Sequence, residues 1–251
     1  MVNGQLSLTI GWLYPDLMST YGDRGNIITL QRRCEWRNIK TQIRRLDVGF
    51  DEKRLATCDI LFMGGAQDTQ QKIVSRDFST EKRILLKKLI EAGIPGLYIC
   101  GAYQFLGKYY KEADGTIIKG LGILDLYTKN PGENSPRLIG NIAIKILSTT
   151  LVGFENHGGR TYIADKELAL GKVVKGFGNN GEDRTEGIMY KNSVGTYLHG
   201  PVLPKNPKLA DFLIAKALEV KYENKIKLEP LDDTLELKAR TVIAKRLGAA
   251  L

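Results

Sequence analysis

The 251-residue sequence is poor in the residues that crosslink or export a chain. It has three cysteines, Cys34, Cys58 and Cys100, which are odd in number and far apart. Such spacing fits reduced thiols better than a disulfide framework, which is typical of secreted domains. The first twenty residues lack a basic segment followed by an apolar one, so no secretory signal is predicted. We therefore expect a cytoplasmic protein.

Long hydrophobic runs are also missing. The best candidate, residues 89–107, is interrupted by Glu91, Pro95 and several glycines, whereas a membrane-spanning helix needs about 18 or more predominantly apolar residues. The apolar fraction of 43% and the charged fraction of 26% are those of globular proteins, which excludes intrinsic disorder and collagen-like repeats. No internal repeat and no Pro-, Gly- or Ser-rich linker divides the chain.

The net charge of +9 is not concentrated in one segment. Lysines and arginines are scattered, and no dense basic stripe with interleaved aromatics or zinc-finger signature is present. We therefore predict no nucleic-acid partner. A basic surface would also suit an anionic protein, a phosphorylated substrate or an acidic membrane face, and charge alone does not choose among them.

Strand-length apolar runs alternate with amphipathic stretches in the first half of the chain. The pattern predicts strands at 6–14, 39–48, 59–65 and 94–100, and helices at 26–36, 80–92 and 102–110. In the helix at 80–92, Ile84, Leu85, Leu89 and Ile90 form one apolar face, and Gly93 ends it with a left-handed residue. This alternation implies right-handed crossovers and a mainly parallel sheet.

Strands predominate after Gly115. They are predicted at 116–119, 121–127, 138–147 and 152–155, with a hairpin formed by 186–190 and 193–198. A helix at 207–220 follows, with Asn206 as its cap and Pro207 in its first turn. The final predicted helix, 232–251, has an apolar face made of Leu235, Ala239, Val242, Ile243 and Leu247. We predict one α/β domain over residues 1–230, with a helix-flanked, mainly parallel sheet and added antiparallel strands, and an appended amphipathic helix over 231–251.

Cys100 lies where an apolar strand ends and a helix begins, and Gly101 follows it. A strand-to-helix elbow presents a side chain at the carboxyl edge of a sheet, where α/β folds bind ligands. The amino terminus of a helix favours a thiolate, and the N–H of Gly101 is placed to bind an oxyanion. The segment therefore fits a nucleophile, and it fits a buried structural cysteine equally well. Cys34 and Cys58 lack this setting and are interpreted as structural.

A cysteine nucleophile needs a base, and the chain has two histidines. His157 and His199 each lie at the end of a predicted strand, where functional sites are commonly built. Either could instead be a buried structural histidine.

A pair of glycines, Gly64 and Gly65, directly follows a predicted strand. Such a pair lets a backbone N–H approach a ligand closely, and it also fits an ordinary β–α turn. No phosphate-binding loop is present, because Gly101 and Gly107-Lys108 have the wrong spacing and lie on a predicted helix. ATP chemistry within this chain is therefore not expected, and no metal site is predicted.

Five segments together resemble a class I glutamine amidotransferase of the cobyric-acid-synthase-like (CobB/CobQ-like) branch, and within it the glutaminase subunits of lipid II isoglutaminyl synthases. The resemblance covers roughly residues 8–217. It implies the flavodoxin-like three-layer fold of that class. The segments are Tyr21-Gly22-Asp23-Arg24-Gly25-Asn26, Gly64-Gly65, Cys100-Gly101-Ala102-Tyr103-Gln104, Gly153-Phe154-Glu155-Asn156-His157-Gly158-Gly159 and Gly195-Thr196-Tyr197-Leu198-His199-Gly200-Pro201.

The resemblance implies the catalytic roles. Cys100 matches the nucleophile that forms a glutamyl thioester, and His199 matches the base that takes the thiol proton and delivers it to the leaving ammonia. The N–H of Gly101 and an N–H in the 64–66 turn, assigned to Gly65, match the oxyanion hole.

The same resemblance implies three residues of the substrate pocket. Gln104 matches the elbow glutamine near the substrate, and Arg137 is the candidate for an arginine that binds substrate. His157 matches a motif histidine near the site, with a role in the pocket or in the structure.

One departure concerns the third catalytic residue. Many class I glutaminases carry a glutamate two residues after the histidine, to orient the imidazole. Here that position is Pro201, as in the cobyric-acid branch, so a Cys–His dyad is the safer statement. Glu155 and Asp183 are possible helpers that the sequence does not place.

The resemblance also implies a partner. The relatives work with an ATP-dependent, Mur-ligase-like synthetase, MurT, which amidates D-glutamate in the stem peptide of lipid II. We therefore expect a heterodimer, with ATP and Mg²⁺ on the partner and no cofactor in this chain. Lipid II, and the inner membrane face, would be reached through the complex. The final helix could cover a sheet edge of this chain or dock on the partner.

Two other functions remain open. The acceptor of ammonia could be different, for example a corrinoid carboxyl as in cobyric acid synthases. The chain could also be a non-catalytic binding subunit on the same fold.

Overall fold

Short apolar runs form the centre of a six-stranded sheet. The computed structural model describes residues 5–147 and 149–249, and the sheet has the order β13-β14-β4-β3-β1-β2. Every residue of β3 and β4 is buried, as expected for parallel strands covered on both faces. All neighbours pair in parallel except β13 and β14, which form the predicted hairpin. The strands are β1 Ser7–Leu13, β2 Lys40–Leu46, β3 Ile60–Met63, β4 Gly96–Ile99, β13 Ile188–Tyr190 and β14 Ser193–Thr196.

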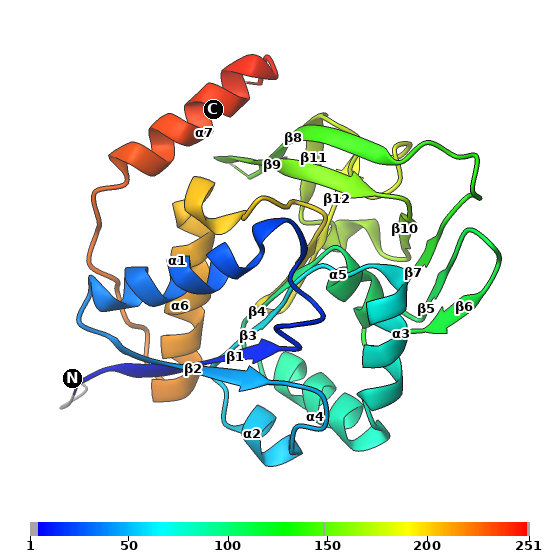
Figure 1. Ribbon diagram of the computed structural model, residues 1–251. Coiled ribbons are helices and arrows are strands. Elements are labelled where there is room, and N and C mark those ends of the chain that lie inside the picture. Colours follow the sequence, from blue (N-terminus) through cyan, green and yellow to red (C-terminus); the bar gives the residue numbers. More distant parts are fainter. Residues whose placement is uncertain (1–4, 148, 250–251) are drawn as a thin grey trace.

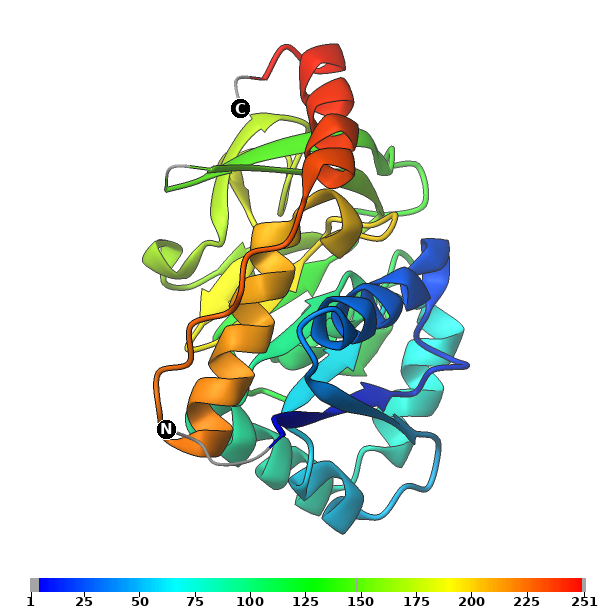
Figure 2. The same cartoon turned by 90° about the vertical axis from the view of Figure 1, so that its left-hand side faces the viewer.

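Helices cover both faces of this sheet, so the predicted helix-flanked, mainly parallel fold is confirmed. Helices α1 and α6 lie together on one face, and α3, α4 and α5 lie on the other (Figures 1 and 2). No helix in the described part of the chain is long and apolar enough to cross a bilayer. The helices are α1 Arg24–Glu35, α2 Glu52–Ala56, α3 Asp68–Asp77, α4 Thr80–Glu91, α5 Gly101–Leu106, α6 Pro207–Tyr222 and α7 Thr234–Arg246.

The second half of the chain contains the predicted antiparallel strands, which form two smaller sheets. One has the order β12-β11-β8-β9 and is antiparallel throughout, and the other has the order β10-β7-β5-β6. Their strands are β5 Tyr109–Lys111, β6 Ile117–Lys119, β7 Leu126–Lys129, β8 Leu138–Ile146, β9 Thr149–His157, β10 Arg160–Ile163, β11 Gly171–Lys175 and β12 Thr185–Glu186. Short 3₁₀ turns are found at Thr20–Gly22, Lys166–Leu168 and Leu203–Lys205. The antiparallel sheet lies above the central sheet in Figure 1, and its strand β9 runs down toward the elbow region.

The helix predicted at 102–110 is shorter than expected. Helix α5 ends at Leu106, and Tyr109 and Tyr110 belong to β5. The cause is tertiary: Lys108 donates its N–H to the carbonyl of Leu126, and a side chain on Gly107 would collide with that same leucine. The strand predicted at 121–127 is shortened for the same reason, since residues 121–124 bond to the carbonyl groups at the end of α5.

The apolar face predicted for α4 is wrong in part, because Ile84 is 48% exposed and the helix is rotated so that Leu86 and Ile90 face the core. Asn206 is the N-cap residue of α6 and Pro207 lies in its first turn, as predicted, but the Asn206 side chain makes no capping hydrogen bond. That side chain bonds instead to the N–H and carbonyl of Val152, at 3.0 and 2.8 Å, and so ties the start of α6 to β9.

The C-terminal helix α7 buries less apolar surface than its sequence pattern suggested. Leu235 is 77% exposed and Val242 is 50% exposed. Its C-terminal part packs with Ile243 and Leu247 against a small apolar cluster that includes Val152 of β9. Figure 2 shows α7 beside the antiparallel sheet. The division at residue 230 and the docking role of this helix stay predictions, and residues 250–251 lie outside the described part.

A buried arginine joins α1 to α6 and to the segment before α7. Arg33 is 1% exposed, and its guanidinium bonds Asp211 at 2.7 and 2.8 Å and Asp233 at 2.6 Å. Arg37 also bonds Asp211, at 2.8 Å. Because a guanidinium buried in this way must keep its carboxylate partners, the cluster fixes the two helices that cover one face of the sheet.

Replacing Arg33 by Met should lower the free energy of unfolding by roughly 3 kcal/mol, since the carboxylate of Asp233 loses its partner. Urea unfolding monitored by circular dichroism measures the change. The neighbouring Arg32→Met variant is the matched control, because Arg32 is 63% exposed and pairs only with Glu35 on the helix surface. It should change stability by no more than about 0.5 kcal/mol. Equal effects of the two variants would contradict the role given to Arg33.

Candidate functional site

Cys100 occupies a strained elbow between β4 and α5. Its backbone has φ 50° and ψ −104°, a conformation that residues other than glycine rarely adopt. Its N–H donates to the carbonyl of Thr196 at 2.8 Å, which holds the elbow against β14. Strain of this kind is found where a nucleophile must be lifted above the edge of a sheet. The structure thus places Cys100 where the sequence predicted.

The glycine pair after β3 lies against this elbow. A Cβ atom on Gly65 would lie 2.8 Å from the ring of His199, and one on Gly101 would lie 3.0 Å from the backbone nitrogen of Ala66. Neither position has room for a side chain, which explains the glycines. Gly101 opens α5, where the first amide groups have no partner within the helix. The elbow and the 64–66 turn therefore lie against each other, with Gly101 close to the backbone of Ala66.

The N–H of Gly65 is engaged in this structure. It donates to Oδ2 of Asp23 at 2.7 Å. The neighbouring residue, Ala66, approaches Gly101 more closely. The oxyanion-hole role assigned to Gly65 stays a prediction, and it requires this N–H to leave the carboxylate.

His199 follows β14 and is anchored to β9 by two backbone hydrogen bonds with Phe154, at 2.7 and 3.2 Å. Its ring is completely buried, and Nδ1 lies 3.3 Å from Oδ1 of Asp23, whose side chain is also completely buried. The ring of Tyr21 meets the imidazole edge-on, with centroids 5.0 Å apart. Nε2 has no hydrogen-bond partner among the described residues, which leaves this nitrogen for the thiol of Cys100.

The electrostatics favour a charged imidazole at His199. Burial lowers the pKa of His199, but the charge of Cys100 and the hydrogen bond to Asp23 outweigh it and raise the pKa to about 10. A thiolate and an imidazolium stabilise each other in such a pair. The arrangement is that of a cysteine nucleophile beside a base whose second nitrogen is oriented by a carboxylate.

Asp23 was not assigned a role from the sequence, although it lies in the motif at 21–26. The two carboxylates considered as helpers point elsewhere. Glu155 accepts hydrogen bonds from the N–H groups of Phe177 and Gly178, at 2.7 and 2.9 Å, and Asp183 accepts from Thr185. The sequence signal for Asp23 is that it is an acidic residue between Gly22 and Gly25, between an apolar strand and the following helix.

A cavity of about 530 Å³ opens beside the elbow. Four residues predicted for the site line it together: Cys100, Gln104, Arg137 and His157. Its walls include the 66–71 segment, the elbow and the end of β9, so segments far apart in the sequence meet here. This volume is in the range of small-molecule sites.

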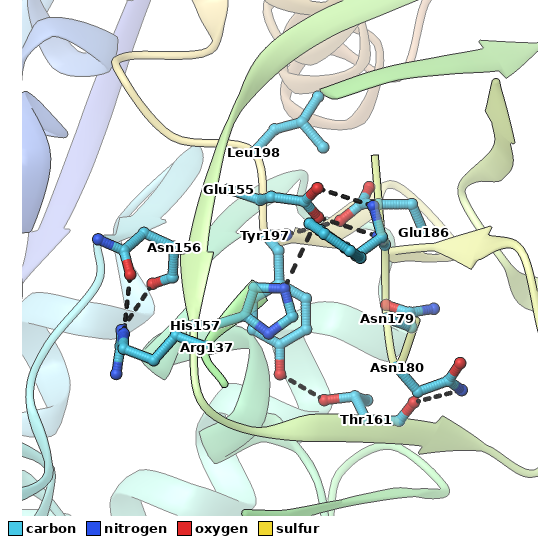
Figure 3. A network of polar contacts seen from close by, with 12 residues as sticks. Arg137, Glu155, Asn156, His157, Thr161, Asn179, Asn180, Glu186, Tyr197 and Leu198 are labelled. Carbon is cyan, nitrogen blue, oxygen red and sulfur yellow. Dashed lines mark hydrogen bonds and ion pairs between the residues drawn. The ribbon is translucent and has the colours of Figure 1, made fainter. Parts of the chain in front are cut away.

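His157 is a buried, neutral wall of this cavity. Its Nδ1 lies 2.7 Å from the carbonyl oxygen of Gly159, and its ring stacks on Tyr197 with centroids 3.6 Å apart (Figure 3). Burial lowers the pKa of His157, and Glu155, 3.8 Å from Nε2, opposes this only partly. This position fits both roles considered for His157, that of a substrate-pocket residue and that of a structural residue.

Arg137 is held at the mouth of the cavity by Asn156. Its guanidinium donates to the side-chain and backbone oxygens of Asn156, each at 2.9 Å (Figure 3). The amide of Asn156 donates in turn to the hydroxyl of Tyr21 at 2.8 Å. This bridge joins three residues that line the cavity, and Arg137 remains exposed, so the substrate role assigned to it stays a prediction.

The other two thiols lie in different surroundings. Burial raises the pKa of Cys34 to about 12 and that of Cys58 to about 11. Both are therefore protonated and unreactive at neutral pH, in keeping with a structural role. In residues 5–147 and 149–249 no group of three or more His, Cys, Asp or Glu side chains is arranged to hold a metal ion.

Comparison with known proteins adds an independent line of evidence. The family model described as the CobB/CobQ-like glutamine amidotransferase domain matches residues 9–207. The chain is 47% identical over 246 residues to a protein of Staphylococcus aureus strain N315 named lipid II isoglutaminyl synthase (glutamine-hydrolyzing) subunit GatD. That match covers 95% of this chain and 96% of the relative. The protein of the same name from Streptococcus pneumoniae strain R6 is 42% identical, over 93% of this chain and 89% of its own.

The fold resembles that of a solved structure as well. The structure titled PurLQS from Thermotoga maritima contains a chain that matches 88% of this one, and 100% of its own length, with a TM-score of 0.52. The sequence identity is 14%, so this likeness concerns the fold alone.

The two histidines should carry different charges at neutral pH. Because a raised pKa keeps an imidazole protonated to higher pH, His199 should be an imidazolium at pH 7, and His157 should be neutral. Nitrogen-15 NMR of the histidine rings measures this directly, and a His157→Asn variant assigns the signals. Asp23→Asn should lower the pKa of His199 and leave that of His157 unchanged. Two rings that both titrate near the ordinary value of about 6.5 would contradict this description of the site.

Proposed function

The chain belongs to the CobB/CobQ-like glutamine amidotransferase family, and from this premise we propose that it is the glutaminase subunit of a lipid II isoglutaminyl synthase. The observation that carries the chemical part is the strained Cys100, at the edge of a cavity and beside the buried pair of His199 and Asp23. The names of the two bacterial relatives support the biological part.

In the first half-reaction the sulfur of Cys100 attacks the side-chain carboxamide carbon of L-glutamine. The carbonyl oxygen becomes an oxyanion, which accepts hydrogen bonds from Gly101 N–H and from an N–H of the 64–66 turn. Each such donor is typically worth about 3 kcal/mol in the transition state. His199 gives its Nε2 proton to the leaving nitrogen, so that ammonia departs and a glutamyl thioester remains.

In the second half-reaction water attacks the thioester. His199, now neutral, takes a proton from this water, and the C–S bond breaks to release L-glutamate and the Cys100 thiolate. Asp23 acts through His199: its carboxylate keeps the imidazole oriented and stabilises the positive charge that the ring carries in each step. Asp23 is therefore a positioning residue.

The carboxylate of Asp23 also holds the Gly65 N–H. For Gly65 to donate to the oxyanion, this hydrogen bond must break and the 64–66 turn must rearrange. Association with a partner subunit is the natural cause of such a change, because Tyr21 and Ala66 of the turn line the cavity. The glutaminase is then fully active only when ammonia has an acceptor.

The remaining pocket residues bind the substrate. The exposed guanidinium of Arg137 receives the α-carboxylate of glutamine, and the ring of His157 forms an apolar, uncharged wall. Gln104 lies between the elbow and Tyr197, and orders the polar groups around the carboxamide end.

The ammonia is used by an ATP-dependent, Mur-ligase-like synthetase, MurT, which carries ATP and Mg²⁺ and amidates the α-carboxyl of D-glutamate in the lipid II stem peptide. The two subunits form a heterodimer in the cytoplasm, and lipid II at the inner membrane face is reached through the partner. The naming of both relatives as subunits of a synthase supports a division of labour of this kind.

Incubation with 6-diazo-5-oxo-L-norleucine, which alkylates the nucleophile of glutaminases, should give one covalent adduct on Cys100. Intact mass and peptide mapping locate the adduct, and excess L-glutamine should block it. Cys34 and Cys58 are internal controls, because burial keeps them protonated. Cys100→Ala and His199→Ala should abolish glutamine hydrolysis with unchanged circular dichroism. A chain that is not labelled, either alone or with its partner, is a binding subunit and not a glutaminase.

Co-expression with a Mur-ligase-like synthetase from the same genome should yield a stable heterodimer. With ATP, Mg²⁺ and L-glutamine this complex should amidate lipid II, and the Cys100→Ala complex should do so only when free ammonium replaces glutamine. Mass spectrometry of the muropeptides reads out the product. Amidation of a corrinoid carboxyl instead of lipid II would assign the chain to the other acceptor class.

A further inference from the structure

Three glutamine residues line the cavity, and one of them, Gln71, has no sequence motif that marks it as a site residue. Gln71 lies on α3 and is 3% exposed. Its Nε2 would be 3.0 Å from a Cβ atom on Gly101, so its amide lies beside the residue that follows the nucleophile. Gln71 therefore lies at the end of the cavity next to the elbow.

A chain of polar groups defines how this amide is oriented. The hydroxyl of Tyr197 lies 2.6 Å from Oγ1 of Thr161 and accepts from Nε2 of Gln104 at 3.0 Å. The Oε1 of Gln104 then accepts from Nε2 of Gln71 at 3.2 Å. In both hydrogen bonds the glutamine side chain donates through its NH₂ group, so the orientation of Gln104 determines that of Gln71.

The backbone of Ala66 excludes the reverse orientation. Its carbonyl oxygen lies 3.5 Å from the Nε2 position of Gln71. If both amides were turned over, Gln71 would place its oxygen near this carbonyl, and two acceptors would face each other. Since a carbonyl oxygen only accepts, the position must be the NH₂ group.

The orientation leaves one atom without a partner. Oε1 of Gln71 is buried and accepts no hydrogen bond from the described residues. A buried carbonyl oxygen of this kind is costly unless a ligand or water satisfies it, and this one belongs to a residue that lines the cavity beside Cys100. A hydrogen-bond donor is therefore expected at this end of the bound ligand.

We propose that Oε1 of Gln71 accepts a hydrogen bond from the carboxamide nitrogen of the substrate and thereby distinguishes glutamine from glutamate. This inference rests on the proposed glutaminase function. The carboxamide presents an N–H toward the acceptor, whereas the carboxylate of the product presents an oxygen, which the carbonyl of Gln71 repels. Gln71 is then the residue that makes the site specific for an amide.

The test exploits a difference between two ligands. The reactive end of 6-diazo-5-oxo-L-norleucine is a diazoketone, which has no NH₂ group to donate. In the Gln71→Met variant it should still label Cys100 at a rate close to that of the wild type. The concentration of L-glutamine needed to protect Cys100 should rise about tenfold or more, and protection by L-glutamate should not weaken.

Gln70→Met is the matched control. Gln70 is the adjacent residue of the same helix and also has a buried Oε1 without a partner, but it does not line the cavity. Protection by L-glutamine should be unchanged in this variant. If the unpartnered oxygen mattered only for packing, both variants would behave alike.

A measurement on the unaltered protein avoids any effect of the mutation on folding. In the wild type, the γ-methyl ester of L-glutamate, which lacks the amide N–H, should protect about tenfold less well than L-glutamine. This preference should vanish in Gln71→Met. The experiments use the heterodimer if labelling requires the partner.

The outcomes separate the two proposals. If the wild type is not labelled in any form, the glutaminase function fails. If the wild type is labelled and protected, but Gln71→Met needs the same glutamine concentration, the role of Gln71 is overturned and the function stands. Loss of labelling in Gln71→Met also overturns the role of Gln71. A residue that binds only the amide nitrogen should not be needed for labelling by 6-diazo-5-oxo-L-norleucine, which has no amide.

Discussion

The site depends on one buried carboxylate that serves two neighbours. Asp23 lies where the loop after β1 enters α1, and its two oxygens hold the imidazole of His199 and the N–H of Gly65. A carboxylate without water must satisfy its charge within the protein, so these contacts fix three segments relative to one another. The glycines of the 64–66 turn follow from the crowding around this carboxylate, because Met18, Thr20, Asp23 and His199 leave no room for a Cβ atom. His199 and the 64–66 turn are thus linked through a single side chain.

Burial affects the two histidines in opposite ways because their neighbours differ. His199 faces a thiol and a carboxylate, which hold it charged in spite of desolvation. His157 is stacked on Tyr197 with its carboxylate neighbour too distant to compensate, so it stays neutral. His199 is therefore charged, whereas His157, which lines the cavity, is uncharged. The exposed Arg137 is the cationic side chain among the described residues that line the cavity.

Much of the site was predictable because its signals are local. An apolar strand followed by Cys100 and Gly101 predicts an elbow, and a glycine pair after another apolar strand predicts a close approach of backbone. Both strands end at the same edge of a parallel sheet, so the two segments had to meet. Asp23 and Gln71 were not predictable in this way. Each acts through an atom that it presents to a residue more than thirty positions away. For Asp23 the local signal, an acidic residue between glycines, does not say which residue it contacts, and Gln71 has no local signal at all.

By itself the sequence determined the alternation of strands and helices, the parallel core and the order of the motifs, because periodicity and glycine position are properties of neighbouring residues. The tertiary structure decided where α5 ends, which face of α4 is buried and how far α7 packs, since each depends on a surface supplied by another segment. It also decided which carboxylate meets His199. A buried charge takes the partner that the fold brings within hydrogen-bonding distance, and that distance is set only when the layers have packed.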